Sequence, residues 1–333
     1  MNETMRVKKM QNKKISIVLS VILLLSAVLS GCEQVTQVQQ KPYIAVVAKA
    51  TESRFWKSVA SGVSTAATEY GVKVTFEGAR NEEDYATQND LIMKAVENRA
   101  QAIVFSAIDA NKSLEAIQEA RKAGIHVVII DSGINTEDID LEISTDNYAA
   151  GEMAADAVLA NKAQELKIGI VNFDINSANG RQREEGFKNK VLQDKRAEIV
   201  DIINVESNIS SGNKGTKRMI EEHPEINVIA TFNEWTSLGV GYAVEEKEML
   251  EDIQVVGFDS NVILADMLER GSVDALILQN PFSIGYLGIE NAYKLIKNNK
   301  QSETVIFTDT TLITRENMFD ENNQKILFPI ENE

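Results

Sequence analysis

The chain has 333 residues, of which 44% are hydrophobic, and this length favours two domains or one large α/β unit. The composition excludes disordered, collagen-like and disulfide-rich proteins. The 34 basic and 50 acidic residues give a net charge of −16, which argues against nucleic-acid binding. Because the chain has two histidines and one cysteine, a zinc site of these residue types is disfavoured, and we expect no metal and no cofactor.

The N-terminal segment has the pattern of a secretory signal. Basic residues between Arg6 and Lys14 precede an apolar run, Ile15 to Leu29, that is short for a membrane span. The run ends in Leu-Ser-Gly-Cys, which is similar to a bacterial lipobox, where the cysteine is lipidated and becomes the new N-terminus. The alternative is an ordinary signal peptide with a chance cysteine at Cys32.

We therefore expect two short segments ahead of the folded part of the chain. These are a lipoprotein signal peptide (1–31) and a polar tether (32–42) that begins with the lipidated Cys32. Two acyl chains suffice for stable attachment, so the folded part is expected at the extracytoplasmic face of a bacterial cell membrane.

Apolar runs and helical patterns alternate from Tyr43 onwards. The runs expected to form strands are 43–47, 72–76, 102–105, 126–130, 168–171, 199–203, 228–231, 253–257, 275–278 and 305–307. The segments with helical spacing are 56–70, 84–96, 114–123, 183–192, 215–222, a segment after Ser237, and 284–296. Continuous apolar strands between helices predict doubly wound parallel sheets, covered on both faces.

Two strands end in the same pattern. Residues 125–132 read IHVVIIDS and residues 253–260 read IQVVGFDS, so both fit I-x-V-V-x-x-D-S. Buried strands resemble one another by chance, but the shared aspartate favours two similar lobes. Ligands of open α/β sheets bind at the carboxyl ends of the strands, and two such edges facing each other form a cleft.

Polar and aromatic side chains gather at these strand ends and in the loops that follow. They are Lys49, Phe55, Trp56, Asp131, Ser132, Arg181, Asn208, Asn233, Asp259 and Gln279, with Glu234 and Trp235 adjacent. Carboxylates accept hydrogen bonds, lysine and arginine donate them, and amides do both, which suits the hydroxyl groups of a polyol. The apolar face of a pyranose also packs on an aromatic ring, so these residue types predict a sugar site.

Seven stretches, in order, give the chain a family resemblance. They are VVAKATESRFW (46–56), VVIIDSG (127–133), STDN (144–147), NGRQREEGF (179–187), ATFNE (230–234), VVGFDS (255–260) and LQNPFSIG (278–285). With them the chain resembles type I periplasmic sugar-binding proteins of ABC transporters, in particular the ribose- and allose-binding group, here in a lipoprotein form. The resemblance implies two doubly wound parallel-sheet lobes joined by a three-strand hinge.

The resemblance implies ligand roles for residues of the first lobe. Phe55 and Trp56 match the aromatics that stack on the sugar, and Asp131 matches the aspartate of that lobe. Lys49 matches a lysine that the allose branch places on a sugar hydroxyl. Ser132 departs from the ribose pattern, which has an arginine there, and Lys49 would partly replace that cation.

The resemblance implies further ligand roles in the second half of the chain. Arg181 matches the arginine of the second lobe, and Arg183 looks like its supporting residue. The remaining polar positions that match are Asn233, Asp259 and Gln279. Asn208 stands where relatives often have an aromatic, so one stacking wall is missing and the pattern supports a sugar site rather than any named sugar.

Some of these positions also have a purely structural interpretation. Asp131 and Asp259 would then be helix caps, and Arg181 would form a surface salt bridge. Phe55 or Trp56 would then belong to the core. Of the two histidines, one lies in an apolar strand and the other precedes a proline in a turn.

The resemblance also implies the division of the chain. The N-terminal lobe would comprise 43–145 plus 280–309, and the C-terminal lobe 146–279 plus 310–333. The chain would cross between the lobes near 144–147, 279–280 and 309–313, with Asp146, Asn147, Gln279 and Asn280 as hinge residues.

The function implied is that of a solute-binding lipoprotein of an ABC importer. The protein is expected to be a monomer. It would capture a monosaccharide and deliver it to the transmembrane permease subunits. The alternative is a sensory protein that presents a sugar or an autoinducer-2-type ligand to a chemoreceptor or sensor kinase. A LacI-type repressor is excluded, because residues 1–42 carry a secretion signal in place of a basic helix-turn-helix.

An enzyme is not expected. The sequence contains no G-x-S-x-G, P-loop or HExxH motif. A glycosidase needs one carboxylic acid kept protonated by an apolar setting, whereas Asp131 and Asp259 are expected to be ionised and flanked by basic groups.

Overall fold

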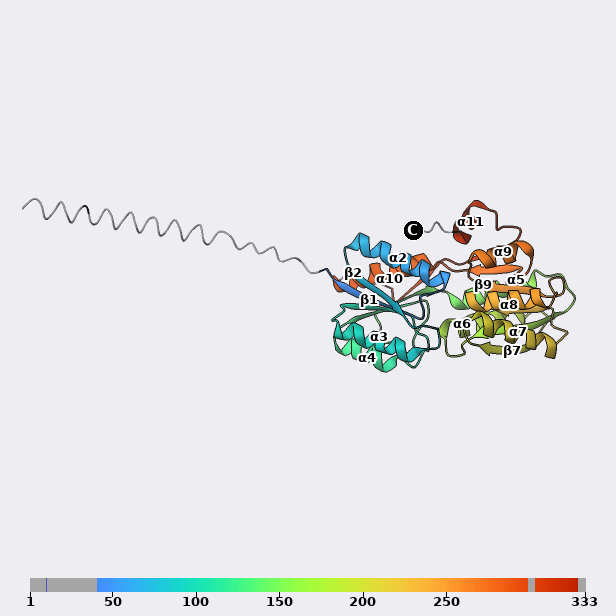
Figure 1. Cartoon of the computed structure of the whole chain (residues 1–333), viewed down its shortest axis with the longest axis horizontal. Helices are drawn as coiled ribbons and strands as arrows, with labels where there is room; N and C mark the ends of the chain where they lie inside the picture. Colours follow the sequence, from blue (N-terminus) through green and yellow to red (C-terminus); the bar gives the residue numbers. More distant parts are fainter. Residues whose placement is uncertain (1–9, 11–40, 299–302, 329–333) are drawn as a thin grey trace, which may run out of the picture. The chain divides into compact units, whose positions relative to one another are not determined.

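Two sheets of six strands each organise the chain in the computed structural model (Figure 1). The structure describes Met10, residues 41–298 and residues 303–328. The expected signal peptide, the lipidated cysteine and the tether lie outside the described residues, apart from Met10, Lys41 and Pro42. None of the helices in the described part of the chain is long and apolar enough to cross a membrane.

The first sheet is entirely parallel. In spatial order its strands are β11 (Val305–Thr308), β5 (Leu141–Thr145), β4 (His126–Ile130), β3 (Ala102–Phe105), β1 (Tyr43–Ala48) and β2 (Lys73–Gly78). Its helices are α2 (Arg54–Tyr70), α10 (Pro281–Ile296), α3 (Tyr85–Glu97) and α4 (Leu114–Lys122). We call this sheet with its helices the first lobe.

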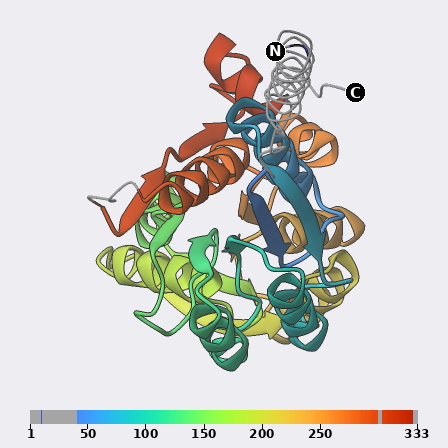
Figure 2. The same cartoon turned by 90° about the vertical axis from the view of Figure 1, so that its left-hand side faces the viewer.

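Both faces of the first sheet are buried. Ile44 and Val46 of β1 belong to the core under α2 and α10, whereas Ala45 and Val47 belong to the core under α3 and α4 (Figures 1 and 2). Successive side chains of a strand point to opposite faces, so a strand covered on both sides needs an unbroken apolar run. The burial of β1 confirms the prediction that the apolar run at 43–47 forms a strand of a sheet covered on both faces.

The second sheet is parallel except for one edge strand. In spatial order its strands are β12 (Thr311–Thr314), β10 (Ala275–Leu278), β9 (Gln254–Phe258), β8 (Val228–Thr231), β6 (Leu166–Phe173) and β7 (Ala197–Val205), with β12 antiparallel to β10. Its helices are α5 (Asn147–Leu159), α6 (Ala178–Val191), α7 (Ile209–Glu222), α8 (Glu234–Glu246), α9 (Val262–Arg270) and α11 (Glu321–Leu327). We call this sheet with its helices the second lobe. The predicted class, two doubly wound α/β sheets, is confirmed.

The chain passes between the two sheets at three places. It leaves β5 of the first sheet at Asp146 and enters α5, which packs against β9 and β10. It returns after β10 through Gln279 and Asn280 into α10, which packs on β3 and β4. It crosses a third time between β11 and β12, through residues 309–310.

Several elements were not predicted. They are β5, α5, α9, β12 and α11, and in addition α6 and α7 begin earlier than expected, at Ala178 and Ile209. The buried face of α5 consists largely of alanine, for example Ala150 and Ala154, and these small residues give a weak apolar pattern. The first turns of α6 and α7 contain glycine and polar residues, which have low helix propensity and hide the helix start.

Candidate ligand-binding site

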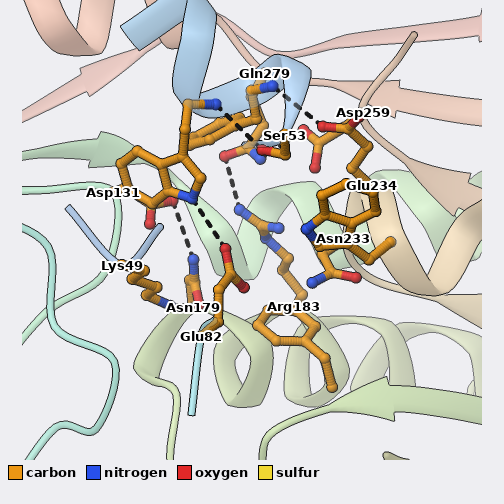
Figure 3. A pocket seen from close by; sticks show the side chains of 14 residues that line it. Lys49, Ser53, Glu82, Asp131, Asn179, Arg183, Asn233, Glu234, Asp259 and Gln279 are labelled. Atoms are coloured by element: carbon orange, nitrogen blue, oxygen red, sulfur yellow. Dashed lines mark hydrogen bonds between the residues drawn. The ribbon is translucent and has the colours of Figure 1, made fainter. Parts of the chain in front are cut away.

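A cavity lies between the carboxyl ends of the two sets of strands. Its lining residues are Lys49, Ser53, Phe55, Trp56, Glu82, Asp131, Phe173, Asn179, Arg183, Asn233, Glu234, Trp235, Asp259 and Gln279 (Figure 3). Both lobes contribute, so the cavity exists only while the lobes face each other.

The aromatic wall comes from the first turn of α2. Ser53 caps this helix, because its hydroxyl oxygen accepts a hydrogen bond from the Trp56 amide at 3.2 Å. The cap fixes the start of the helix and thereby places the rings of Phe55 and Trp56 at the cavity. The rings contact edge to face, with centroids 5.1 Å apart, and Trp56 is only 1% exposed.

Asp131 follows β4 in the left-handed backbone conformation, with φ at 59°. Its two carboxylate oxygens accept hydrogen bonds from different lobes, from the Ser106 hydroxyl at 2.9 Å and from the Asn179 amide at 3.1 Å. The Lys49 ammonium donates to the Asn179 amide oxygen at 3.3 Å and to the Ser177 hydroxyl at 2.7 Å. Asn179 therefore links the cation and the carboxylate of the first lobe to α6 of the second.

Arg183 is the buried cation of the second lobe, with an exposed fraction of 1%. Its Nε donates to Asn147 Oδ1 at 2.8 Å, and its two terminal nitrogens donate to the Phe232 carbonyl and to Gln279 Oε1, both at 2.7 Å. The guanidinium also lies 4.8 Å from the ring centroid of Phe258. These partners fix the guanidinium in a single orientation towards the cavity (Figure 3).

Asp259 mirrors Asp131 in the second lobe. It follows β9 in the same left-handed conformation, with φ at 64°, and one oxygen accepts a hydrogen bond from Gln279 Nε2 at 2.8 Å. Burial raises the pKa of Asp259 from 3.8 to about 7, while the nearby Arg183 charge opposes the rise. Burial also lowers the pKa of Arg183, and the charge of Asp259 opposes that shift as well.

The Glu234 carboxylate of the second lobe contacts the N-terminus of α2 in the first lobe. The Glu234 side chain accepts hydrogen bonds from the backbone amides of Arg54 at 3.3 Å and Phe55 at 3.1 Å. These amides are at a helix N-terminus, where they lack intrahelical partners and where negative charge is stabilised. Together with the Asn179 contacts, this shows the two lobes in a closed arrangement around the cavity.

Seven of the ten predicted ligand residues line the cavity: Lys49, Phe55, Trp56, Asp131, Asn233, Asp259 and Gln279. Asn233 also caps α8 by accepting a hydrogen bond from the Thr236 amide. That these seven side chains contact a ligand stays a prediction.

The other three predicted residues lie elsewhere. Arg181 is exposed, and Arg183, two positions further on, occupies the cavity wall in its place. Asn208 caps α7 by accepting a hydrogen bond from the Ser211 amide at 2.8 Å. Ser132 is fully buried behind Asp131 and does not line the cavity, so the arginine expected there in the ribose pattern has no counterpart.

The four predicted hinge residues either cap the helices that follow the crossings or form hydrogen bonds near the cavity. Asp146 and Asn280 cap α5 and α10, the helices that follow two of the crossings. Asn147 accepts a hydrogen bond from Arg183, and Gln279 accepts one from the Thr145 hydroxyl at 2.9 Å. The crossing segments are therefore bonded directly to cavity residues.

Sequence reasoning missed several lining residues: Ser53, Glu82, Phe173 and Asn179, and it left the contribution of Trp235 open. Ser53 and Asn179 lie within stretches that carried the family resemblance, two positions before Phe55 and two positions before Arg181. Glu82 lies in the loop after β2, at the same sheet edge as the other candidates, but this placement does not distinguish it from its acidic neighbours Glu83 and Asp84. The described residues contain no group of three or more His, Cys, Asp or Glu side chains that would hold a metal ion.

The position of Arg183 depends on a close contact between α5 and α6. A Cβ added at Gly151 of α5 would collide with the carbonyl oxygen of Arg183, and Gly186 of α6 lies equally close to the Tyr148 carbonyl. We expect Gly151→Ala to push α6 outwards and to lower the free energy of unfolding by about 2 kcal/mol. Urea denaturation measures the loss.

Alanine at Gly71 is not a suitable control, because Gly71 has a positive φ. Ala160→Gly at the end of α5 is a better one, since it changes the same helix without a clash. Equal stability of Gly151→Ala and the wild-type protein would contradict the close packing of α5 on α6.

A polar and aromatic cavity, enclosed by two α/β lobes that three crossings join, defines a two-lobed binding protein. The chain belongs to the periplasmic binding protein family, because the model of the periplasmic binding protein domain matches residues 44–300. The members of this family are solute-binding proteins rather than enzymes, in agreement with the sequence-based expectation.

Similar proteins span nearly the same length. The ribose import binding protein of Bacillus subtilis is 25% identical over 75% of this chain and 80% of its own length. The D-ribose/D-allose-binding protein of Pseudomonas aeruginosa is 24% identical over 88% of this chain and 97% of its own length. A carbohydrate transporter solute-binding protein from Agrobacterium radiobacter, solved with D-arabinose, is 27% identical with a TM-score of 0.83, covering 87% of this chain and 99% of its own.

A sugar transporter structure from Clostridium phytofermentans is 31% identical. It superposes with a TM-score of 0.75 and covers 82% of this chain and 99% of its own. The chain is thus similar to these proteins over most of its length.

Proposed function

We propose that the protein captures a monosaccharide in the cavity between its lobes and delivers it to the membrane permease of an ABC importer. The observation that carries the proposal is the cavity itself, where acceptors, donors and aromatic rings from both lobes converge on a small volume. The names of similar proteins support the same ligand class, since they include ribose, allose and D-arabinose binders.

The site chemistry suits an uncharged polyol. Asp131 and Asp259 offer carboxylate acceptors, while Lys49 and Arg183 offer charged donors to sugar hydroxyls. Hydrogen bonds to charged groups contribute about 1.5–3 kcal/mol each, so a few of them suffice for tight binding. The Trp56 and Phe55 rings would pack on the apolar face of the sugar.

Binding would be coupled to a hinge motion. Rotation about the three crossings would separate the lobes and open the cavity to solvent. A sugar that contacts both lobes binds the closed form better than the open form, and this difference in affinity shifts the population towards closure. The closed form would then be the one that the permease recognises.

A thermal-shift screen of pentoses, hexoses and polyols tests the proposed ligand class. We expect one or a few sugars to raise Tm at millimolar concentration, with one-to-one binding in calorimetry. If no saccharide raises Tm or gives heat of binding, the proposal fails.

The proposed membrane anchor is tested separately. We propose that Cys32 carries the lipid and that residues 1–31 are removed, as the sequence pattern predicts. We expect Cys32→Ser to move the protein from the membrane fraction to the soluble fraction, because the thioether-linked lipid can no longer be attached. Immunoblots of fractionated cells measure this, and unchanged sugar affinity of the purified variant serves as the control. A variant that stays with the membrane would show that Cys32 is not the anchor.

A further inference from the structure

Glu82 connects the two lobes at the edge of the cavity. It lies in the loop between β2 and α3, and its two carboxylate oxygens have partners in different lobes. Oε1 accepts a hydrogen bond from the Trp56 indole nitrogen at 2.9 Å, within the first lobe (Figure 3). Oε2 accepts one from the Ser207 hydroxyl at 2.7 Å, from the second lobe.

Ser207 forms hydrogen bonds with several residues in this closed arrangement. It lies between β7 and α7, is 5% exposed, and its backbone amide donates to the Glu83 carboxylate at 2.6 Å. Its hydroxyl oxygen also accepts a hydrogen bond from the Asn233 amide nitrogen at 2.7 Å. Two consecutive carboxylates of the first lobe therefore hold one residue of the second, and that residue is bonded to the cavity residue Asn233.

The result is a continuous chain of hydrogen bonds across the lobes. It runs from the Trp56 indole through Glu82 to Ser207 and on to Asn233. Buried indole N–H groups need an acceptor, and a carboxylate forms the stronger type of bond. Opening of the lobes would remove Ser207 from Glu82 and leave the carboxylate hydrated, with only the indole as its partner.

We propose that Glu82 is a positioning residue for ligand binding, which sets the orientation of the Trp56 ring and ties that orientation to closure of the lobes through Ser207. The inference rests on the proposed function, because the ring is the expected stacking surface for the sugar. Glu82 acts on the ligand through Trp56 and through the closed state.

Affinity measurements on three variants test the proposal with the sugar found in the screen. We expect Glu82→Ala to raise the dissociation constant at least tenfold, mainly through faster release, because the closed form loses its contact. Glu82→Gln keeps an oxygen for the indole N–H and should lose less. Ser207→Ala should raise the constant several-fold. The matched control is Glu77→Ala, which removes a surface carboxylate of β2 that pairs with Lys94.

The double variant separates a shared contact from two independent ones. If Glu82 and Ser207 act through the same hydrogen bond, the loss of binding free energy in the double variant Glu82→Ala/Ser207→Ala is smaller than the sum of the two single losses. Additive losses, or a Glu82→Ala protein that binds and releases sugar like the wild type, would overturn the proposal.

The fluorescence of Trp56, measured without sugar, tests this proposal independently of the proposed function. The chain has two tryptophans, so Trp235→Phe leaves Trp56 as the single indole fluorophore. In that background we expect Glu82→Ala to shift the Trp56 emission to longer wavelength, because the indole loses its carboxylate partner and becomes hydrated. Unchanged emission would overturn the positioning role, whereas a wild-type protein that binds no saccharide would refute the proposed function alone. Should Glu82→Ala fail to fold, Ser207→Ala and Glu82→Gln decide the outcome.

Discussion

Arg183→Met should abolish sugar binding and lower the free energy of unfolding by about 3 kcal/mol. The change removes a buried guanidinium but keeps a side chain of similar length. Two acceptors, Asn147 Oδ1 and the Phe232 carbonyl, lose their donor, whereas Gln279 Oε1 keeps the Thr145 hydroxyl. Each buried acceptor left without a partner costs about 1–3 kcal/mol.

The effect on affinity has a second cause. Asp259 loses the nearby positive charge that opposes the rise of its pKa, so the carboxyl becomes neutral at a higher pH and accepts sugar hydroxyls less well. We expect at least a hundredfold rise in the dissociation constant, about 2.7 kcal/mol, in calorimetry near neutral pH.

Arg181→Met is the matched control for this experiment. Arg181 lies on the same helix, carries the same charge and is exposed. We expect this variant to match the wild-type protein in both affinity and stability. The opposite result, loss of binding in Arg181→Met with binding kept in Arg183→Met, would show that the ligand lies outside the cavity described.

The sequence pattern gave the ligand role to Arg181, whereas Arg183 lines the cavity, so the pattern is insufficient to choose between the two arginines. Residues two apart on a helix point to nearly opposite sides, so assigning the buried one requires knowing which face of α6 packs inwards. That face is set by the contact of Gly151 with the Arg183 carbonyl, on a helix whose small residues gave no clear apolar pattern. The family motif contains both arginines and does not distinguish them.

The sheets and the strand-end residues were predictable for a simple reason. A strand that is buried on both faces must be apolar throughout, so the central strands are visible as short apolar runs. The residue that follows such a strand lies at the sheet edge in any doubly wound fold, which is why Asp131 and Asp259 both line the cavity.

Glu82 was not predictable in the same way. It stands in a loop next to Glu83 and Asp84, and nothing in the local pattern separates these three acidic residues. Its partner Ser207 is 125 positions away, and the contact depends on how the two lobes close. Such long-range polar contacts are set by tertiary structure, and a single sequence carries no periodic signal for them.

Asp259→Asn should make stability less dependent on pH and weaken sugar binding most strongly in alkaline solution. The pKa of Asp259 is raised from 3.8 to about 7 in the folded protein, so between these values the folded state binds more protons than the unfolded state. The free energy of unfolding of the wild-type protein therefore falls as the pH rises through this window, by about 4 kcal/mol at most from this group. Asparagine does not titrate, so its variant lacks this contribution.

Urea denaturation of both proteins at pH 5 and pH 8 measures the difference. We expect the stability of Asp259→Asn relative to the wild type to increase from pH 5 to pH 8. Asp266→Asn, at an exposed position of α9, is the control and should follow the wild-type pH dependence. A parallel pH dependence of Asp259→Asn and the wild type would contradict the raised pKa.

Sugar affinity should show the complementary dependence. Above pH 7 the ionised Asp259 is a charged acceptor, and its bonds to sugar hydroxyls are about twice as strong as those of a neutral group. We expect the wild type to bind at least tenfold more tightly than Asp259→Asn at pH 8, and the gap to narrow at pH 6 as the carboxyl takes up its proton. Calorimetry at pH 6, 7 and 8 measures both curves. Equal affinities at pH 8 would remove Asp259 from the set of ligand-binding groups, whatever the stability data show.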